Sequence, residues 1–132
     1  MTVYFCLDDQ GGLLFNGRRL SRDAVLVADM AAMVPDTLTI DPFSEKLIAA
    51  AGIPYALAGE ALPEEAHFFL ENRDPETVLP LAQTLVIYRW NRQYPSDVRW
   101  EKIPADHGFT LSETKEFPGK SHEIITKEVY VK

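Results

Sequence analysis

The chain has 132 residues, of which 46% are hydrophobic and 25% charged, as in an ordinary globular domain. This length predicts a single domain over residues 1–132 that buries roughly two-thirds of the surface exposed by the unfolded chain. Twenty acidic against thirteen basic residues give a net charge of −7, which repels nucleic acid and anionic membranes at long range. General nucleic-acid binding and membrane binding are therefore disfavoured.

The cysteine content and the hydropathy pattern indicate the compartment. Cys6 is the one cysteine, so an intrachain disulfide and a zinc site built on several thiolates are excluded. The N-terminus lacks a basic region followed by a long apolar segment, and no run approaches the ~18 apolar residues of a membrane span. We expect a cytoplasmic protein.

Strands and helices are expected to alternate along the first part of the chain. Val3–Leu7 reads as a buried strand, and the glycines after it permit a turn and a loop. Ser21 is a good N-cap for a helix over residues 22–34, where apolar residues recur at mostly helical spacing until a proline ends it. A short strand over 37–40 and a second helix over 45–51 follow.

The alternation continues through the middle of the chain. Strands are predicted over 53–57 and 67–70. Asp74 is a cap followed by proline at the first helical position, which predicts a short helix over 75–82 before a strand over 84–90. This order favours a mainly parallel sheet flanked by helices, an α/β fold.

The last part of the chain is expected to form antiparallel strands. The candidates are residues 98–100, 109–113 and 124–131. The final segment has two interpretations, because Ser121 could cap a helix whereas residues 128–132 alternate as in a half-buried strand. We favour the strand.

Two segments near the N-terminus, Phe5-Cys-Leu-Asp-Asp-Gln-Gly-Gly12 and Leu20-Ser-Arg-Asp23, together resemble dihydrofolate reductase. The first is similar to that family's first strand and the glycine-containing loop after it. The second stands where the family has leucine, proline, any residue and the catalytic acid. Leu79 through Trp90 looks like the family's helix end and following strand. The resemblance implies a single-domain mixed sheet with helices on its faces and an antiparallel C-terminal hairpin, here shortened.

The chain departs from the family where the family binds NADPH. The family's cofactor-binding glycine pair should lie near Leu70-Glu71-Asn72-Arg73, which contains no glycine and adds a carboxylate. Its phosphate clamp should lie near Asp41-Pro42-Phe43-Ser44, where only the hydroxyl survives. A carboxylate and side chains in place of glycine repel and obstruct a diphosphate. We therefore expect no cofactor and no NADPH-dependent reductase activity.

The resemblance also implies a candidate ligand site. It places Asp23 opposite Tyr88, which stands where the family has a threonine that hydrogen-bonds the acid, and Phe5, Cys6 and Val27 would complete a small cleft for a polar planar ligand. A buried carboxylate needs such a donor. The alternative is that Asp23 only favours the helix dipole and that Tyr88 is a core aromatic.

Two further groups of polar residues are candidates for an anion site and for a metal site. Arg18, Arg19 and Arg22 form a candidate anion site, with solvated or salt-bridged arginines as the alternative. His122 carries potential metal-ligand atoms, as do Asp8, Asp9 and Glu123, but no His-x-His or His-Glu-x-x-His spacing accompanies them. We therefore expect no metal site, and interpret Cys6 as a small core residue rather than a nucleophile.

The sequence is compatible with three functions. The first is a binding module for a small molecule or a protein, with the reductase-like fold but without its cofactor. The second is an enzyme that acts on a pterin-like heterocycle and uses Asp23 for proton transfer. The third is a structural protein that forms a homodimer through an exposed sheet.

Overall fold

The computed structural model describes residues 1–132. Its helices are α1 (Ala24–Met33), α2 (Glu45–Ala50) and α3 (Pro75–Val78). Its strands are β1 (Thr2–Leu7), β2 (Gly12–Phe15), β3 (Arg18–Arg19), β4 (Leu38–Ile40), β5 (Tyr55–Leu57), β6 (His67–Phe69), β7 (Thr84–Arg89), β8 (Val98–Arg99), β9 (Thr110–Phe117) and β10 (Ile125–Val131). Short 3-10 turns precede α2, follow α3 and precede β9.

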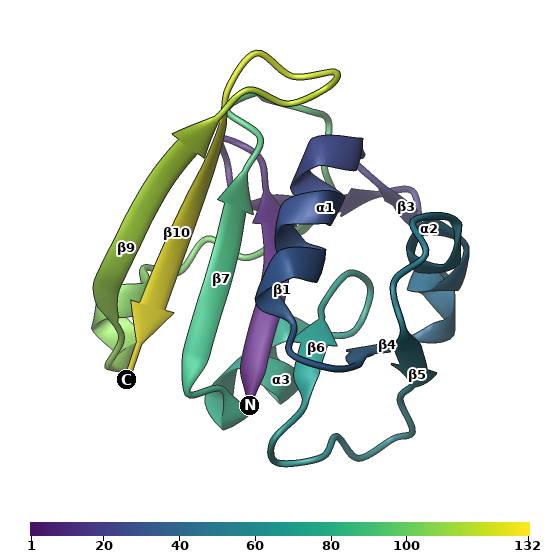
Figure 1. Ribbon diagram of the computed structural model, residues 1–132. Coiled ribbons are helices and arrows are strands. Elements are labelled where there is room, and N and C mark those ends of the chain that lie inside the picture. Colours follow the sequence, from purple (N-terminus) through teal and green to yellow (C-terminus); the bar gives the residue numbers. More distant parts are fainter.

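One mixed sheet organises the molecule. Its seven strands run in the order β5-β4-β6-β1-β7-β10-β9. The first five are parallel, and β10 pairs antiparallel with both β7 and β9 (Figure 1). The expected α/β fold is thus confirmed, as are the antiparallel C-terminal strands and the assignment of the final segment as a strand.

A second, small sheet was not expected from the sequence. It joins β3, β2 and β8, and it includes residues of the segment after β1 that the sequence analysis assigns to a loop. The prediction of a loop is wrong, because β2 and β3 pair as a hairpin. Its turn lies at Asn16 and Gly17, which both have positive φ. The hairpin brings the segment that follows it, Leu20–Asp23, against the main sheet.

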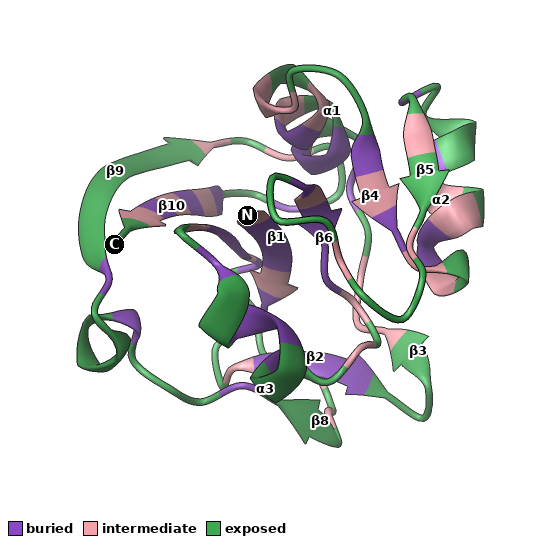
Figure 2. Ribbon diagram, turned by 90° about the horizontal axis from the view of Figure 1, so that it is seen from below, coloured by how far each residue is buried: buried purple, intermediate pink, exposed green.

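The alternation of side chains along the central strand divides the core into two halves. In β1, Val3, Phe5 and Leu7 face one half, whereas Tyr4 and Cys6 face the other. Seen end-on, α1 lies on one side of the sheet, and α3 lies on the other with β2 and β8 (Figure 2). The central strands are therefore buried on both faces, as expected for parallel strands.

The helix expected over residues 22–34 begins at Ala24, and its N-cap is Asp23 rather than Ser21. The Asp23 carboxylate accepts hydrogen bonds from the backbone N–H of Val25 and Leu26, at 2.9 and 3.4 Å. The helix expected over 75–82 is α-helical only as far as Val78 and continues as a 3-10 turn. No helix of the structure is long and apolar enough to cross a membrane.

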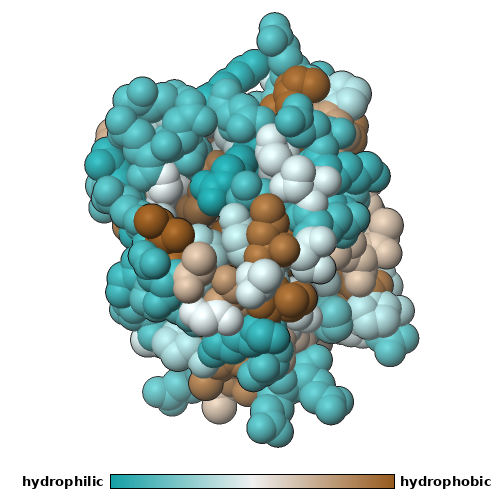
Figure 3. Space-filling view, turned by 90° about the vertical axis from the view of Figure 1, so that its left-hand side faces the viewer, coloured by the Kyte–Doolittle hydropathy of each residue, from teal (hydrophilic) through white to brown (hydrophobic).

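Strand β9 forms one edge of the main sheet, and most of its side chains are exposed. Glu113, Lys115 and Glu116 lie on this edge strand, and charged side chains of this kind protect an edge against pairing with another chain. The side of the molecule that carries β9 is mainly hydrophilic, with a few separate hydrophobic patches (Figure 3). This surface gives no specific support to dimerisation.

Candidate functional site

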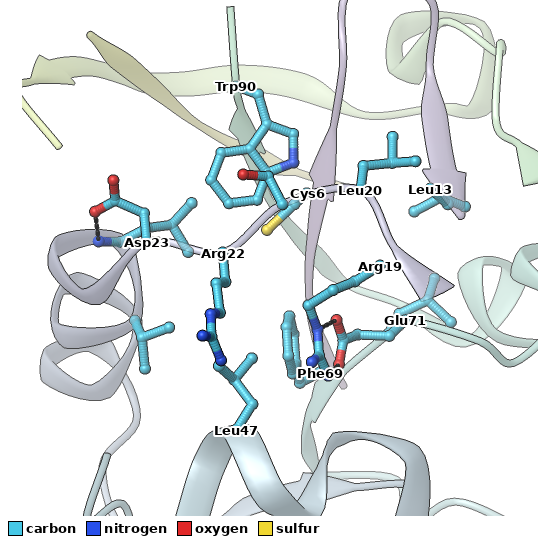
Figure 4. Close-up of a pocket in the computed structure, with 14 residues that line it drawn as sticks. Cys6, Leu13, Arg19, Leu20, Arg22, Asp23, Leu47, Phe69, Glu71 and Trp90 are labelled. Atoms are coloured by element: carbon cyan, nitrogen blue, oxygen red, sulfur yellow. Dashed lines mark hydrogen bonds and ion pairs between the residues drawn. The ribbon is translucent and has the colours of Figure 1, made fainter. Parts of the chain in front are cut away.

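A small cavity lies where the carboxyl ends of three strands meet α1. Cys6 of β1, Phe69 at the end of β6 and Trp90 after β7 line it, together with the segment Leu20–Asp23 (Figure 4). This edge of an open α/β sheet is where ligands generally bind. The cavity leaves about 20 Å³, which is room for about one water molecule.

A larger groove runs between α1 and α2 and adjoins the cavity. It encloses about 750 Å³. Its walls are mainly alanine and aliphatic side chains: Ala24, Val27, Ala28, Ala31, Leu47, Ala50, Ala51 and Ile53. Arg22, Lys120 and Ser121 line its polar part beside Asp23. Arg22, Asp23, Val27 and Leu47 line both the cavity and the groove, so the two form one continuous region.

The carboxylate of Asp23 connects α1 to the loop between β9 and β10. Besides capping α1, it accepts hydrogen bonds from the backbone N–H of Lys120 at 3.0 Å and of Ser121 at 2.9 Å, and it contacts His122 Nδ1 at 2.9 Å. Burial by itself raises the pKa of Asp23, but the hydrogen bonds from Lys120, His122 and Ser121 outweigh burial and hold the pKa well below its ordinary value. The carboxylate is therefore ionised at neutral pH.

His122 is the functional candidate that sequence reasoning did not place here. Its side chain is 1% exposed, and its Nε2 lies 3.0 Å from Ser21 Oγ and 3.1 Å from the Tyr94 hydroxyl. The ring stacks on Trp90 with centroids 4.6 Å apart. The sequence offers no local signal for the Asp23–His122 pair because the two residues are 99 positions apart.

Tyr88 does not donate a hydrogen bond to Asp23, so the predicted contact between them is wrong. The Tyr88 hydroxyl donates to Asp29 Oδ2 at 2.7 Å, and Lys127 Nζ lies 3.1 Å from the same oxygen. Asp29 is six residues beyond Asp23 and hence about 9 Å further along α1, where the helix faces the middle of β7. Burial, reinforced by Asp29, raises the pKa of Tyr88 well above its ordinary value.

The remaining residues of the expected cleft lie on both faces of the sheet. Phe5 is fully buried on the opposite face, where its ring packs edge-on against Trp100 at 5.5 Å. Adjacent residues of a strand point to opposite faces, so Phe5 and Cys6 cannot share one cleft. Cys6 and Val27 do line the cavity. Burial, followed by the charge of Glu71, raises the pKa of the Cys6 thiol well above its ordinary value.

The three arginines of the expected anion site do not gather around one point. Arg18 is exposed, and Arg19 pairs with Glu71 through two hydrogen bonds of 2.8 Å. Ser44 Oγ also donates to Glu71, at 2.7 Å. Arg22 forms no salt bridge and extends across the cavity toward α2 (Figure 4). Of the three arginines, only Arg22 both lacks a salt bridge and lines the cavity and the groove.

Asp8, considered above as a metal ligand, instead closes the turn after β1. Its carboxylate accepts hydrogen bonds from the backbone N–H of Gln10, Gly12 and Tyr94, at 2.9, 2.6 and 2.9 Å. The bond to Tyr94 holds that segment beside His122. No group of three or more His, Cys, Asp or Glu side chains lies close enough to hold a metal ion.

Comparison with known proteins establishes the fold. No family model and no curated protein matches the chain. Among solved structures it is similar to the dihydrofolate reductase from Enterococcus faecalis complexed with NADP(H) and RAB-propyl, with a TM-score of 0.66 and 11% sequence identity over 98% of this chain and 94% of that chain. Similarity at this level of identity establishes the architecture and leaves the activity open. The chain therefore has a dihydrofolate reductase-like fold.

Proposed function

We propose that the protein binds a small molecule with a flat, largely apolar body and an anionic end in the groove between α1 and α2. The groove of about 750 Å³ carries this proposal, because small-molecule sites enclose roughly 300–1,000 Å³. Its walls suit an apolar body. Arg22 and Lys120 suit an anionic end, because neither forms a salt bridge within the protein.

Two ion pairs support a ligand other than NADPH. The segments that the resemblance assigns to the cofactor's phosphates contain Glu71 and Asp41, which pair with Arg19 and Arg73. Ser44, the hydroxyl that survives from the family's clamp, donates to Glu71. Two carboxylates repel a diphosphate, and the arginines that would attract it are already paired.

The environment of Asp23 favours binding over proton transfer by that residue. A carboxyl that delivers a proton near neutral pH needs a raised pKa, whereas the pKa of Asp23 is lowered. Its side chain is 0% exposed, and both oxygens accept hydrogen bonds from the protein. Asp23 therefore holds the site together, while Arg22 and the groove walls contact the ligand.

Folic acid tests this proposal, because it joins a flat bicyclic ring and an aromatic ring to two carboxylates. We would measure its affinity by isothermal titration calorimetry for the wild type and for Ala28→Phe, which places a ring in the groove. Ala32→Phe is the matched control, since Ala32 is also exposed on α1 but does not line the groove.

The expected result is binding to the wild type and to Ala32→Phe, with a loss of at least about tenfold in Ala28→Phe. Arg22→Gln should weaken binding up to about fivefold, because an exposed charge pair contributes up to about 1 kcal/mol. Equal affinity in all four proteins would place the folic acid elsewhere. Absence of binding to the wild type, with NADPH bound instead, would overturn the choice of ligand class.

A further inference from the structure

Three side chains beside the cavity are connected in the order of a nucleophile, a base and an orienting carboxylate. Ser21 Oγ lies 3.0 Å from His122 Nε2, and His122 Nδ1 lies 2.9 Å from Asp23 Oδ2. Nε2 thus contacts the Ser21 hydroxyl and Nδ1 contacts the carboxylate. Nδ1 also lies 3.2 Å from Ser121 Oγ, which itself donates to Asp23 Oδ2. This is the geometry by which a serine nucleophile is recognised on unrelated folds.

The hydrogen-bond partners determine where the proton of the imidazole lies. The Asp23 carboxylate is ionised and can only accept, so Nδ1 of neutral His122 carries the hydrogen. The lone pair of Nε2 is then available to the Ser21 hydroxyl. Stacking on Trp90 holds the plane of the ring, and burial of the His122 and Asp23 side chains excludes competing water.

We propose that Ser21 is the nucleophile of an acyl-transfer site that accepts small carboxylic esters of acetyl size, with His122 as general base and Asp23 as the residue that orients it. The acyl group is limited by the cavity, whose about 20 Å³ admits one group of about the size of water or a methyl. The backbone N–H groups of Ser21 and Arg22 donate no hydrogen bond to another backbone group, and this proposal assigns them as the donors to the oxyanion.

The reaction balances with water as the co-reactant. Ser21 Oγ forms a bond to the carbonyl carbon and gives its proton to His122 Nε2. The bond from that carbon to the ester oxygen then breaks, and the leaving alcohol takes the proton from Nε2. A water molecule then attacks the carbonyl carbon of the acetyl-serine and gives one proton to Nε2. The bond from that carbon to Ser21 Oγ breaks, and Oγ takes the proton from Nε2, which releases acetic acid and regenerates the serine. The net change is the hydrolysis of one ester to an acid and an alcohol.

The groove and the serine make separable contributions. The alcohol part of the ester would lie in the groove, and this part of the inference rests on the proposed function. Attack by Ser21 does not depend on the groove. Ala28→Phe should therefore weaken binding of folic acid at least about tenfold without preventing acetylation of Ser21 by a small reagent.

The test uses p-nitrophenyl acetate, whose acetyl methyl group fits the cavity, with peptide mass spectrometry to locate and time the acetylation. Ser112 is the reference residue because it is exposed on β9 and remote from His122. Ser21 should acetylate at least about 100-fold faster than Ser112, since a positioned general base contributes about 10²–10⁴-fold. The rate should fall to the Ser112 level in His122→Gln, and Ser21→Ala should lose the rapid release of p-nitrophenol that Ser112→Ala retains.

The Tyr94 hydroxyl also contacts His122 Nε2, at 3.1 Å. The competing interpretation is that His122 activates Tyr94 rather than Ser21. Tyr94→Phe should retain acetylation of Ser21. Equal acetylation of Ser21 and Ser112 in the wild type would overturn the proposal, as would acetylation of Tyr94 in preference to Ser21. If His122→Gln does not fold, Ser21→Ala still tests the proposal, because Ser21 is half-buried and the substitution leaves the Asp23–His122 contact intact.

Discussion

Removing the carboxylate of Asp23 should destabilise the protein far more than removing an ordinary helix cap. Asp23→Ala deletes the cap of α1, worth about 0.5–2 kcal/mol. It also leaves the backbone N–H groups of Lys120 and Ser121 and the ring of His122 without their acceptor, at about 1–3 kcal/mol for each group that stays buried. Allowing for partial rehydration of the loop, we expect a loss of about 3–5 kcal/mol by urea unfolding at pH 7.

Asp74→Ala is the matched control, because Asp74 caps α3 through one exposed hydrogen bond to the N–H of Glu76. It should cost about 1 kcal/mol. Similar losses for Asp23→Ala and Asp74→Ala would refute the reasoning, since they would show that the contacts of Asp23 with the β9–β10 loop contribute nothing beyond a cap.

The same carboxylate makes a pH-dependent contribution to stability. The pKa of Asp23 is lower in the folded protein than its ordinary value near 3.8. A lowered folded pKa stabilises the folded state above the unfolded pKa, and this contribution is lost as the pH falls below it. The wild type should therefore lose stability more steeply than Asp23→Asn between about pH 5 and pH 3. Parallel pH profiles of the unfolding free energy would contradict this.

Three further perturbations test other parts of the structure. Gly119→Ala would place a Cβ 2.5 Å from a carboxylate oxygen of Asp23 and should cost about 1–3 kcal/mol in urea unfolding, whereas Gly59→Ala, which meets nothing within 4 Å, should cost less than about 0.5 kcal/mol. Cys6 should react with iodoacetamide at pH 8 at least about tenfold more slowly in the folded than in the unfolded protein, because burial raises its pKa, and equal rates would refute this. Tyr88→Phe should lower the unfolding free energy by about 1 kcal/mol through loss of its 2.7 Å hydrogen bond to α1; an unchanged urea midpoint would show that this bond contributes no net stability.

Much of the architecture follows from patterns within single segments. The apolar run at the start of the chain, the helical spacing before Met33 and the alternation in the last strand each predict the observed element. A strand was predicted over 98–100, where β8 lies, but nothing local indicates that it pairs with β2 in a separate sheet. β2 and β3 were assigned to a loop, because β3 has only two residues and forms only by pairing with β2.

The site could be predicted only in part, because its contacts join distant segments. The resemblance places Asp23 at the start of α1, and the structure places Cys6 and Val27 beside it in the same region. The resemblance does not reveal that His122, in the loop before the last strand, contacts Asp23. Tyr88 was paired with the wrong carboxylate because β7 crosses α1 further along the helix, at Asp29.

Methyl NMR of alanine-labelled protein during a titration with folic acid tests most directly whether the groove between α1 and α2 binds a ligand with an apolar body and an anionic end. We expect the methyl signals of Ala24, Ala28 and Ala31 to shift together with one dissociation constant, whereas that of Ala32 stays in place. Shifts confined to alanines outside the groove, or no shifts at saturating folic acid, would contradict it.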